Sequence, residues 1–221
     1  MNVTDAITQR HATRAFTDKS VSTDIIQSLL DIARHSPSGA NTQPWHVAVV
    51  RGETKQQLQN ALQQTFAAET TSNADYAYYP TSWKAPYSER RKACGLQLYQ
   101  SLDISKQDKE KRLEQWAANY RAFDAPVLLL FFIDAIMETG SYLNYGMFLQ
   151  SLMLAAQDRG LATCPQASLA EYPDIVRSTL HYSDDYHVVC GMALGYEDTT
   201  AAVNRYRTPR EEVSTFTQFF D

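Results

Sequence analysis

The sequence lacks the short motifs with which many proteins hold a phosphate or a nucleotide. It contains no Gly-x-Gly-x-x-Gly fingerprint and no Gly-x-x-x-x-Gly-Lys loop, and only eight of its 221 residues are glycines. Its five histidines and its carboxylates form no cluster with the spacing of a metal site or of a catalytic triad. We therefore expect no metal, no permanently held NAD and no catalytic side chain.

Cysteine and long apolar runs are also scarce. The three cysteines, Cys94, Cys164 and Cys190, are far apart and form no Cys-x-x-Cys pair, which indicates reduced, mostly buried thiols in a cytoplasmic protein. The longest apolar run, residues 125–133, falls well short of the ~20 residues that span a bilayer. Residues 1–13 lack the apolar segment of a signal peptide. No membrane association is expected.

The overall composition favours one domain that does not bind nucleic acid. With 44% apolar residues, the chain is long enough for one substantial core and too short for two ordinary domains with a linker. We expect a single domain over residues 1–221, with a helical and aromatic excursion at about residues 67–125. The net charge of -5 gives no global attraction to phosphate polymers, so any basic site must be local.

Hydrophobic periodicity predicts alternating helices and strands. Asp5 is expected to cap a short first helix, and Ser22 or Thr23 a second helix that Pro37 and Gly39 end. Further helices are expected at residues 54–66, 88–102, 105–120, 142–159 and 172–180. Strands are expected at residues 45–50, 126–133, 161–164 and 187–194.

Three segments have a less regular character. Residues 73–87, here called the flap, are rich in tyrosine, tryptophan and proline without a clear period, and one or two of their rings could line a substrate channel. The helix at residues 142–159 is apolar on all sides, so it should be buried on several sides. The tail after Arg210 alternates apolar and polar residues and ends in Phe219 and Phe220, unlike a disordered polar tail.

Two segments could form a binding site. Residues 10–16 (RHATRAF) place three potential cations within five positions, where Arg side chains can hold a phosphate. Residues 36–45 (SPSGANTQPW) form a loop rich in turn residues just after a helix. Together they indicate an anion cradle and a loop that binds a ring.

These two segments, residues 160–166 (GLATCPQ), residues 191–198 (GMALGYED) and residues 204–210 together resemble the FMN-dependent nitroreductase family. The similarity is greatest to the nitrobenzoate reductase-like members with a longer insert. It extends from the first helix to about Glu212, and residues 67–125 match least. The resemblance implies an α+β, three-layer fold with a mixed, mostly antiparallel sheet flanked by helices, and a C-terminal strand exchanged in a homodimer.

The resemblance also implies a function and a set of site residues. The implied activity is the reduction of nitroaromatic or related electron-poor acceptors by a ping-pong mechanism, with FMN as cofactor and NAD(P)H as a diffusible co-substrate. The phosphate cradle would comprise Arg10, His11, Ala12, Arg14 and either Arg207 or Arg210, with Arg205 as a lesser candidate. The flavin ring would be contacted by Pro37, Ser38, Gly39 and Asn41 across the dimer interface, and by Pro165, Gln166 and Ala167.

Two departures from the family pattern keep alternatives open. Many members have a serine at the position of Ala12, and relatives often have an acidic residue at the position of Asn144. A flavin-binding protein without turnover is one alternative. A flavin-dependent dehalogenase, ene reductase or quinone/flavin reductase is another, because one fold hosts many chemistries. The sequence does not decide the acceptor or the choice between NADH and NADPH.

Overall fold

The centre of the molecule is a four-stranded antiparallel sheet. The computed structural model describes residues 1–220. The strands follow the order β1-β2-β4-β3 and are β1 (His46–Val50), β2 (Val127–Asp134), β3 (Ala162–Gln166) and β4 (Tyr186–Gly195). Every pair of neighbouring strands is antiparallel. The parallel component expected of a mixed sheet is limited to one bridge, between Ala12 and Thr163.

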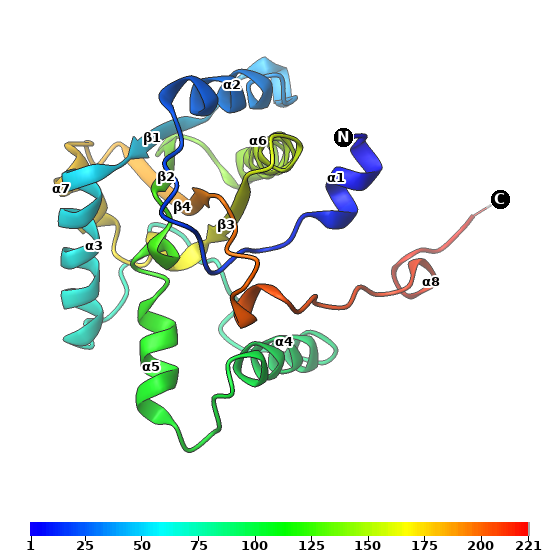
Figure 1. Cartoon of the computed structure of the whole chain (residues 1–221). Coiled ribbons are helices and arrows are strands. Elements are labelled where there is room, and N and C mark those ends of the chain that lie inside the picture. The colour runs from blue at the N-terminus through cyan, green and yellow to red at the C-terminus, as the bar shows by residue number, and fades with distance from the viewer. Residues whose placement is uncertain (221) are drawn as a thin grey trace.

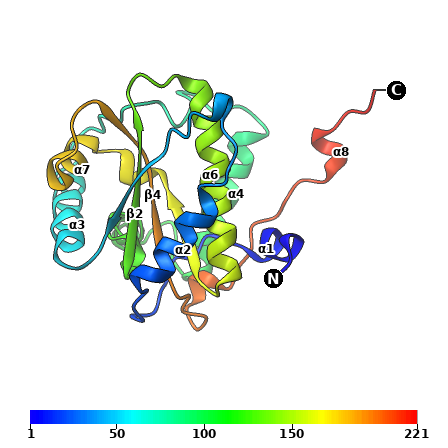
Figure 2. The ribbon, with the colours of Figure 1, turned by 90° about the horizontal axis from the view of Figure 1, so that it is seen from above.

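Helices cover both faces of this sheet, which gives the three layers that the sequence predicted (Figures 1 and 2). One face carries α2 (Thr23–Ala33) and α6 (Thr139–Asp158), and α1 (Val3–Gln9) packs against α6. The other face carries α3 (Gly52–Ala67) and α7 (Pro173–Leu180), which contact each other.

Strand β2 explains why the longest apolar run is continuous. Val127, Leu129 and Phe131 belong to the core under α2 and α6, whereas Leu128 and Leu130 belong to the core on the face of α3 and α7. Successive side chains of a strand point to opposite faces, so a strand covered on both faces needs an apolar residue at every position.

Helix α6 has one buried and one exposed side. Its residues Tyr145, Phe148 and Leu152 lie in the core, but Leu143 and Met147 are 75% and 40% exposed. The helix is therefore not buried on all sides within a single chain. Neither α6 nor any other described helix combines the length and the hydropathy needed to cross a membrane.

The excursion between α3 and β2 contains the flap, α4 (Tyr87–Ser101), α5 (Lys109–Ala117) and the 3-10 turn η2 (Ala122–Asp124). Neither α4 nor α5 has a buried residue, in keeping with the charged pattern of both segments. Helix α5 is shorter than the predicted 105–120. Residues 122–124 have positive φ values, which no continuing helix adopts. The treatment of residues 67–125 as an excursion of one domain stays a prediction.

Several local predictions need correction. The first helix is capped by Asn2, whose side-chain oxygen accepts from the backbone N–H of Asp5 at 2.9 Å, and not by Asp5 itself. The second helix is capped by Ser22, one of the two predicted caps. Cys164 and Cys190 are buried as expected, but Cys94 is exposed because it lies on α4.

The C-terminal segment leaves the body of the molecule (Figure 2). After η4 (Ala202–Asn204) it forms one short helix, α8 (Val213–Phe216), and no strand up to residue 220. Phe216, Phe219 and Phe220 are each at least 70% exposed. The exchange of a C-terminal strand within a dimer stays a prediction.

Candidate functional site

The free edge of β3 brings distant segments together. Ala12 forms a parallel bridge with Thr163, and the backbone N–H of Thr13 donates to the carbonyl of Thr163 at 3.1 Å. Phe16 in turn forms an antiparallel bridge with Glu197, just after β4. Residues 10–14 therefore lie beside β3, and the chain that follows β4 returns to the same place.

Asn204 fixes the returning chain against the N-terminal segment. Its side chain is buried and accepts from the backbone N–H of Arg14 at 2.8 Å. The same amide donates to the carbonyls of Ala15 and Asp198 at 2.8 and 2.9 Å. Two of these partners belong to the N-terminal segment and one to the chain after β4, so Asn204 holds the two segments together.

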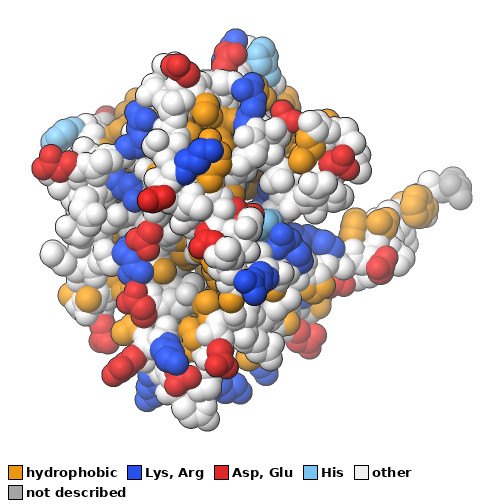
Figure 3. All heavy atoms as spheres, viewed as in Figure 1, with side chains coloured by type: hydrophobic (Ala, Val, Ile, Leu, Met, Phe, Trp, Pro, Cys, Tyr) orange, Lys and Arg blue, Asp and Glu red, His pale blue; other side chains and the backbone are white. Residues whose placement is uncertain are grey.

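Between these segments lies a cavity of about 720 Å³ with a strongly cationic lining. Four arginines line it, Arg10, Arg14, Arg207 and Arg210. Within residues 1–220, none of the four lies within 4.0 Å of a carboxylate. Figure 3 shows basic side chains gathered between α1 and the base of the C-terminal segment. Unpaired cations in a hollow are suited to an anion with several oxygen atoms.

The four guanidinium groups are held differently. Arg14 donates to the hydroxyl of Tyr206 at 3.1 Å, and Arg207 donates to the carbonyl of Asn204 at 2.7 Å. Burial lowers the pKa of Arg10, and the nearby charge of Arg210 lowers it further. Arg10 and Arg210 are therefore close enough to repel each other, and a bound anion would relieve that repulsion.

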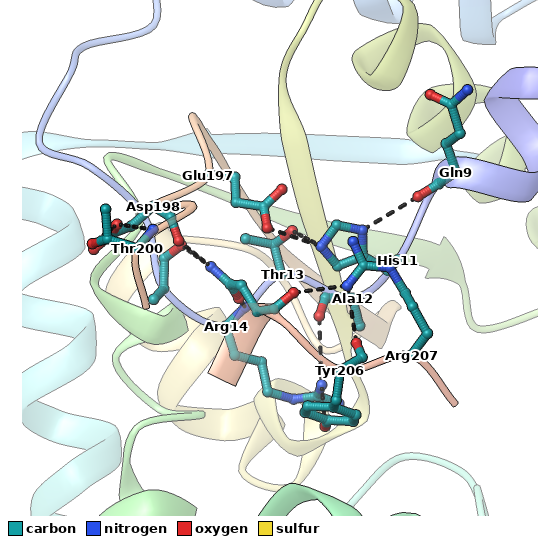
Figure 4. Close-up of polar contacts among 12 residues, drawn as sticks. Gln9, His11, Ala12, Thr13, Arg14, Glu197, Asp198, Thr200, Tyr206 and Arg207 are labelled. Carbon is teal, nitrogen blue, oxygen red and sulfur yellow. Dashed lines mark hydrogen bonds and ion pairs between the residues drawn. The ribbon is translucent and has the colours of Figure 1, made fainter. Parts of the chain in front are cut away.

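The other predicted residues of the phosphate cradle differ in whether they line this cavity. His11 lines the same cavity, and its Nε2 lies 3.1 Å from a carboxylate oxygen of Glu197 (Figure 4). Ala12 also lines the cavity but offers no hydroxyl to a ligand. Arg205 donates to the carbonyl of Thr200 at 2.6 Å and is not part of the lining. The structure thus places Arg207 and Arg210, but not Arg205, at the cavity.

A second cavity, of about 310 Å³, shares Pro165 with the first. Its lining is largely aromatic and apolar and includes Gln166 and Ala167. Of the aromatic residues in the flap, Tyr76 and Tyr78 line it, together with Tyr142 of α6. Burial raises the pKa of the Tyr76 hydroxyl, which donates to the carbonyl of Val189 at 2.6 Å. A planar ring could occupy this cavity while an attached anionic group occupies the first.

The turn that joins the two cavities depends on a close approach at Gly191. The 3-10 turn η3 (Ala167–Ala170) follows directly on β3 and packs on β4. A Cβ atom at Gly191 would lie 2.3 Å from Cδ1 and 2.9 Å from Cβ of Leu169. Only glycine leaves room for η3 at this distance, and so for the position of Ala167.

The loop at Pro37, Ser38, Gly39 and Asn41 lines neither cavity in the single chain. It contains the short turn η1 (Gly39–Asn41), whose Gly39 N–H donates to Oδ1 of Asn144 at 3.2 Å. Ala40, Asn41 and Gln43 all have positive φ values, an uncommon conformation for residues with a side chain. Such strain often accompanies ligand-binding loops.

Cys164 cannot act as a nucleophile near this site. Its thiol is buried beside β4, and burial raises its pKa to about 11. The thiolate, which is the reactive form, is therefore nearly absent at neutral pH.

A family model described as the nitroreductase family matches residues 7–196. This chain belongs to the nitroreductase family. It is 42% identical over 213 residues to a 4-nitrobenzoate reductase from Pseudomonas putida, with 96% of this chain and 93% of the relative covered. The predicted family is thereby confirmed.

Solved structures agree in fold. The chain is similar to the FMN- and NADPH-dependent nitroreductase NfnB from Sphigopyxis sp. strain HMH, with a TM-score of 0.96, 36% identity and full coverage of both chains. The FMN-dependent NfnB from Mycobacterium smegmatis in complex with NADPH gives a TM-score of 0.93 at 34% identity, with 99% of this chain and 97% of that chain covered. The predicted nitroreductase-like fold is confirmed.

Some residues of the site had no signal of their own in the sequence. Asn204 and Tyr206 stand in a segment that the family resemblance includes, but nothing in their spacing shows that one is buried and the other bonds to Arg14. Asp75 and Arg177, which hold the flap, are 102 residues apart and belong to no motif. An alignment of relatives could have indicated these pairs through covariation.

Proposed function

We propose that this nitroreductase-family protein is an FMN-dependent oxidoreductase that uses NAD(P)H to reduce nitroaromatic acceptors. The proposal rests on two cavities that share Pro165. One is lined by four arginines without a carboxylate partner, and the other by aromatic rings. This donor set fits a molecule with a phosphate at one end and a planar ring at the other. When bound, FMN supplies the redox chemistry by taking electrons from NAD(P)H and passing them to the acceptor in a separate step.

Within the chain, each group has a proposed task. Arg10 and Arg210 would bind the phosphate directly, because both line the cavity and their charges lie close enough to repel each other. Arg14 and Arg207 are already oriented by Tyr206 and by a carbonyl group, and would complete the cradle. Backbone groups of residues 165–167 would border the ring.

The remaining site residues are proposed to act from a second copy of the chain. The loop at residues 37–41 is held by Asn144 and lines neither cavity, so it would reach a flavin only across a dimer interface. The exposed apolar side chains of Val3, Ile7 and Leu143 on α1 and α6, and of Phe219 in the tail, support a homodimer. The free thiols are in keeping with a cytoplasmic location.

One observation favours an enzyme over a protein that only carries flavin. Asn144 stands where relatives often have an acidic residue, yet its Oδ1 still accepts from the N–H of Gly39. The departure therefore preserves the contact that a carboxylate would make. Ala12 lacks the hydroxyl of a serine, so the loss of one hydrogen bond to the phosphate, worth about 1.5–3 kcal/mol, is the expected consequence.

The function is tested with purified protein. It should be yellow, its flavin absorption should bleach on addition of NADPH or NADH, and 4-nitrobenzoate should restore the absorption. Colourless protein that cannot be reconstituted with FMN would contradict the proposal. An acceptor panel of nitrobenzoates, quinones, enones and halogenated phenols separates a nitroreductase from the alternative flavin enzymes. Bound flavin with no NAD(P)H oxidation on any acceptor would indicate a carrier.

A further inference from the structure

The flap has few attachments to the body of the molecule. No hydrogen bond within residues 1–220 involves residues 77–83. On the N-terminal side of this stretch, the backbone N–H of Asn73 donates to the carbonyl of Glu171 at 3.1 Å. The start of this stretch therefore depends on how Asp75 and Tyr76 are held. At its far end, the ring of Trp83 contacts Arg91 of α4, whose guanidinium carbon lies 5.4 Å from the ring centroid.

Asp75 is held by a buried ion pair. Arg177 of α7 donates through one terminal nitrogen to both carboxylate oxygens of Asp75, at 3.0 and 2.8 Å. The side chains of Arg177 and Asp75 are only 8% and 10% exposed. The backbone N–H of Val188 also donates to Asp75, at 2.7 Å, so the carboxylate joins α7, β4 and the flap.

The residue after Asp75 is a wall of the second cavity. The ring of Tyr76 packs on that of Tyr142 with centroids 4.9 Å apart, and both line the cavity with Tyr78. Arg177 itself does not line the cavity. It can influence a ligand there only through Asp75 and the tyrosines.

We propose that Arg177 and Asp75 are positioning residues that hold Tyr76 and Tyr78 in place to seat the aromatic acceptor, and so set its KM. This inference rests on the proposed function. A buried ion pair is a poor source of net stability but gives a specific geometry. Arg177 also donates to Asp174 of α7 at 2.6 Å, so it is held on its own helix while it binds the Asp75 carboxylate. In the proposed arrangement residues 165–167 border the flavin ring in the second cavity, and Tyr76 and Tyr78 border the acceptor that stacks on that ring.

The test uses a variant that removes both charges together. Replacing Arg177 alone by a neutral residue would leave the Asp75 carboxylate buried without a counter-charge and would destabilise the protein. The double variant Asp75→Asn/Arg177→Met keeps an acceptor for Val188 N–H and keeps the volume of the arginine stem. Arg177→Lys serves as the conservative variant. Arg121→Met is the matched control, because Arg121 pairs with Glu114 and Asp124 and does not line the cavity.

In the double variant, the KM for 4-nitrobenzoate should rise about tenfold, because a wall that shifts by about 1 Å weakens the seating of a ring. The kcat should change less than KM, and Arg177→Lys should recover part of the loss. Turnover with ferricyanide, which needs no seated ring, and the Kd for FMN should stay unchanged. Hydrogen exchange of the Asn73 and Val188 amides, which are hydrogen-bonded at the base of the flap, should become faster, with little change in Arg121→Met.

Three results would overturn the inference. One is a double variant with wild-type KM and wild-type exchange of the Asn73 and Val188 amides. Another is a loss of FMN affinity and melting temperature with no change in KM, which would indicate a purely structural pair. The third is an equal rise of KM in Arg121→Met. Wild-type protein that reduces no nitroaromatic acceptor would instead contradict the proposed function, and the exchange experiment would still decide whether the pair holds the flap.

Discussion

The most informative single perturbation is Arg10→Met. The substitution removes the guanidinium charge but keeps an unbranched stem of similar length, so that packing against Met153 is largely retained. Arg10 has no carboxylate partner in residues 1–220, and its only recorded side-chain contact is with the sulfur of Met153 at 4.0 Å. Little native structure should therefore depend on its charge.

The substitution should weaken the binding of FMN, but it should leave the melting temperature of the flavin-free protein unchanged or higher. Loss of one charge-assisted contact to a phosphate is worth about 1.5–3 kcal/mol, so the Kd for FMN should rise about ten- to a hundredfold. The pKa of Arg10 is lowered by burial and by Arg210, which means that the fold disfavours its charged form. Without FMN, the variant should melt within about 2 °C of wild type or higher.

The assay is a fluorescence titration of flavin-free protein with FMN and with riboflavin. Riboflavin lacks the phosphate, so its weaker binding should respond little to the substitution. Arg205→Met is the matched control from the same segment as Arg207, because Arg205 bonds to the carbonyl of Thr200 away from the cavity. Its Kd for FMN should equal that of wild type.

The result that refutes the cradle is a wild-type Kd for FMN in Arg10→Met. An equal loss of FMN and riboflavin binding, together with a lower melting temperature, would also refute it and would assign Arg10 to the structure of the fold. Only a selective loss of the phosphorylated ligand agrees with the proposed role.

Three further predictions concern other parts of the site. Gly191→Ala should push η3 away through Leu169, lower stability by about 1–3 kcal/mol and weaken FMN and riboflavin equally, as followed by thermal melting and titration; unchanged binding of both would refute the account of the turn. Deleting the chain after Ser214 should shift light scattering towards the ~25 kDa monomer and release flavin at the same time, whereas a flavin-loaded monomer would contradict the shared site. At pH 7.5, iodoacetamide should label Cys94 alone in the native protein. Burial raises the pKa of Cys164 from 9.0 to about 11, so the native state loses stability relative to the unfolded state as the pH rises from 9 towards 11, and Cys164→Ala should reduce that loss in melting experiments.

The amino-acid sequence alone determined the elements and the family. The apolar run of β2 and the periodic segments of α2, α3 and α7 were correctly predicted because burial on one or two faces leaves a local pattern. The ordered motifs at residues 10–16, 36–45, 160–166, 191–198 and 204–210 identified the family, and through it the candidate residues. The cap at Asn2 and the early end of α5 were missed, because each depends on backbone conformations that several residue types adopt.

The tertiary structure alone decided which of these residues meet. Arg14 and Asn204 are 190 residues apart, and the bridges of Ala12 to Thr163 and of Phe16 to Glu197 bring their segments together. Arg207 and Arg210 line the cavity and Arg205 bonds to Thr200 away from it, although all three stand in one short segment. The sequence could not show which of these arginines points into the cavity. In an irregular segment the direction of a side chain depends on hydrogen bonds to residues far away in sequence, and such partners leave no periodic pattern nearby.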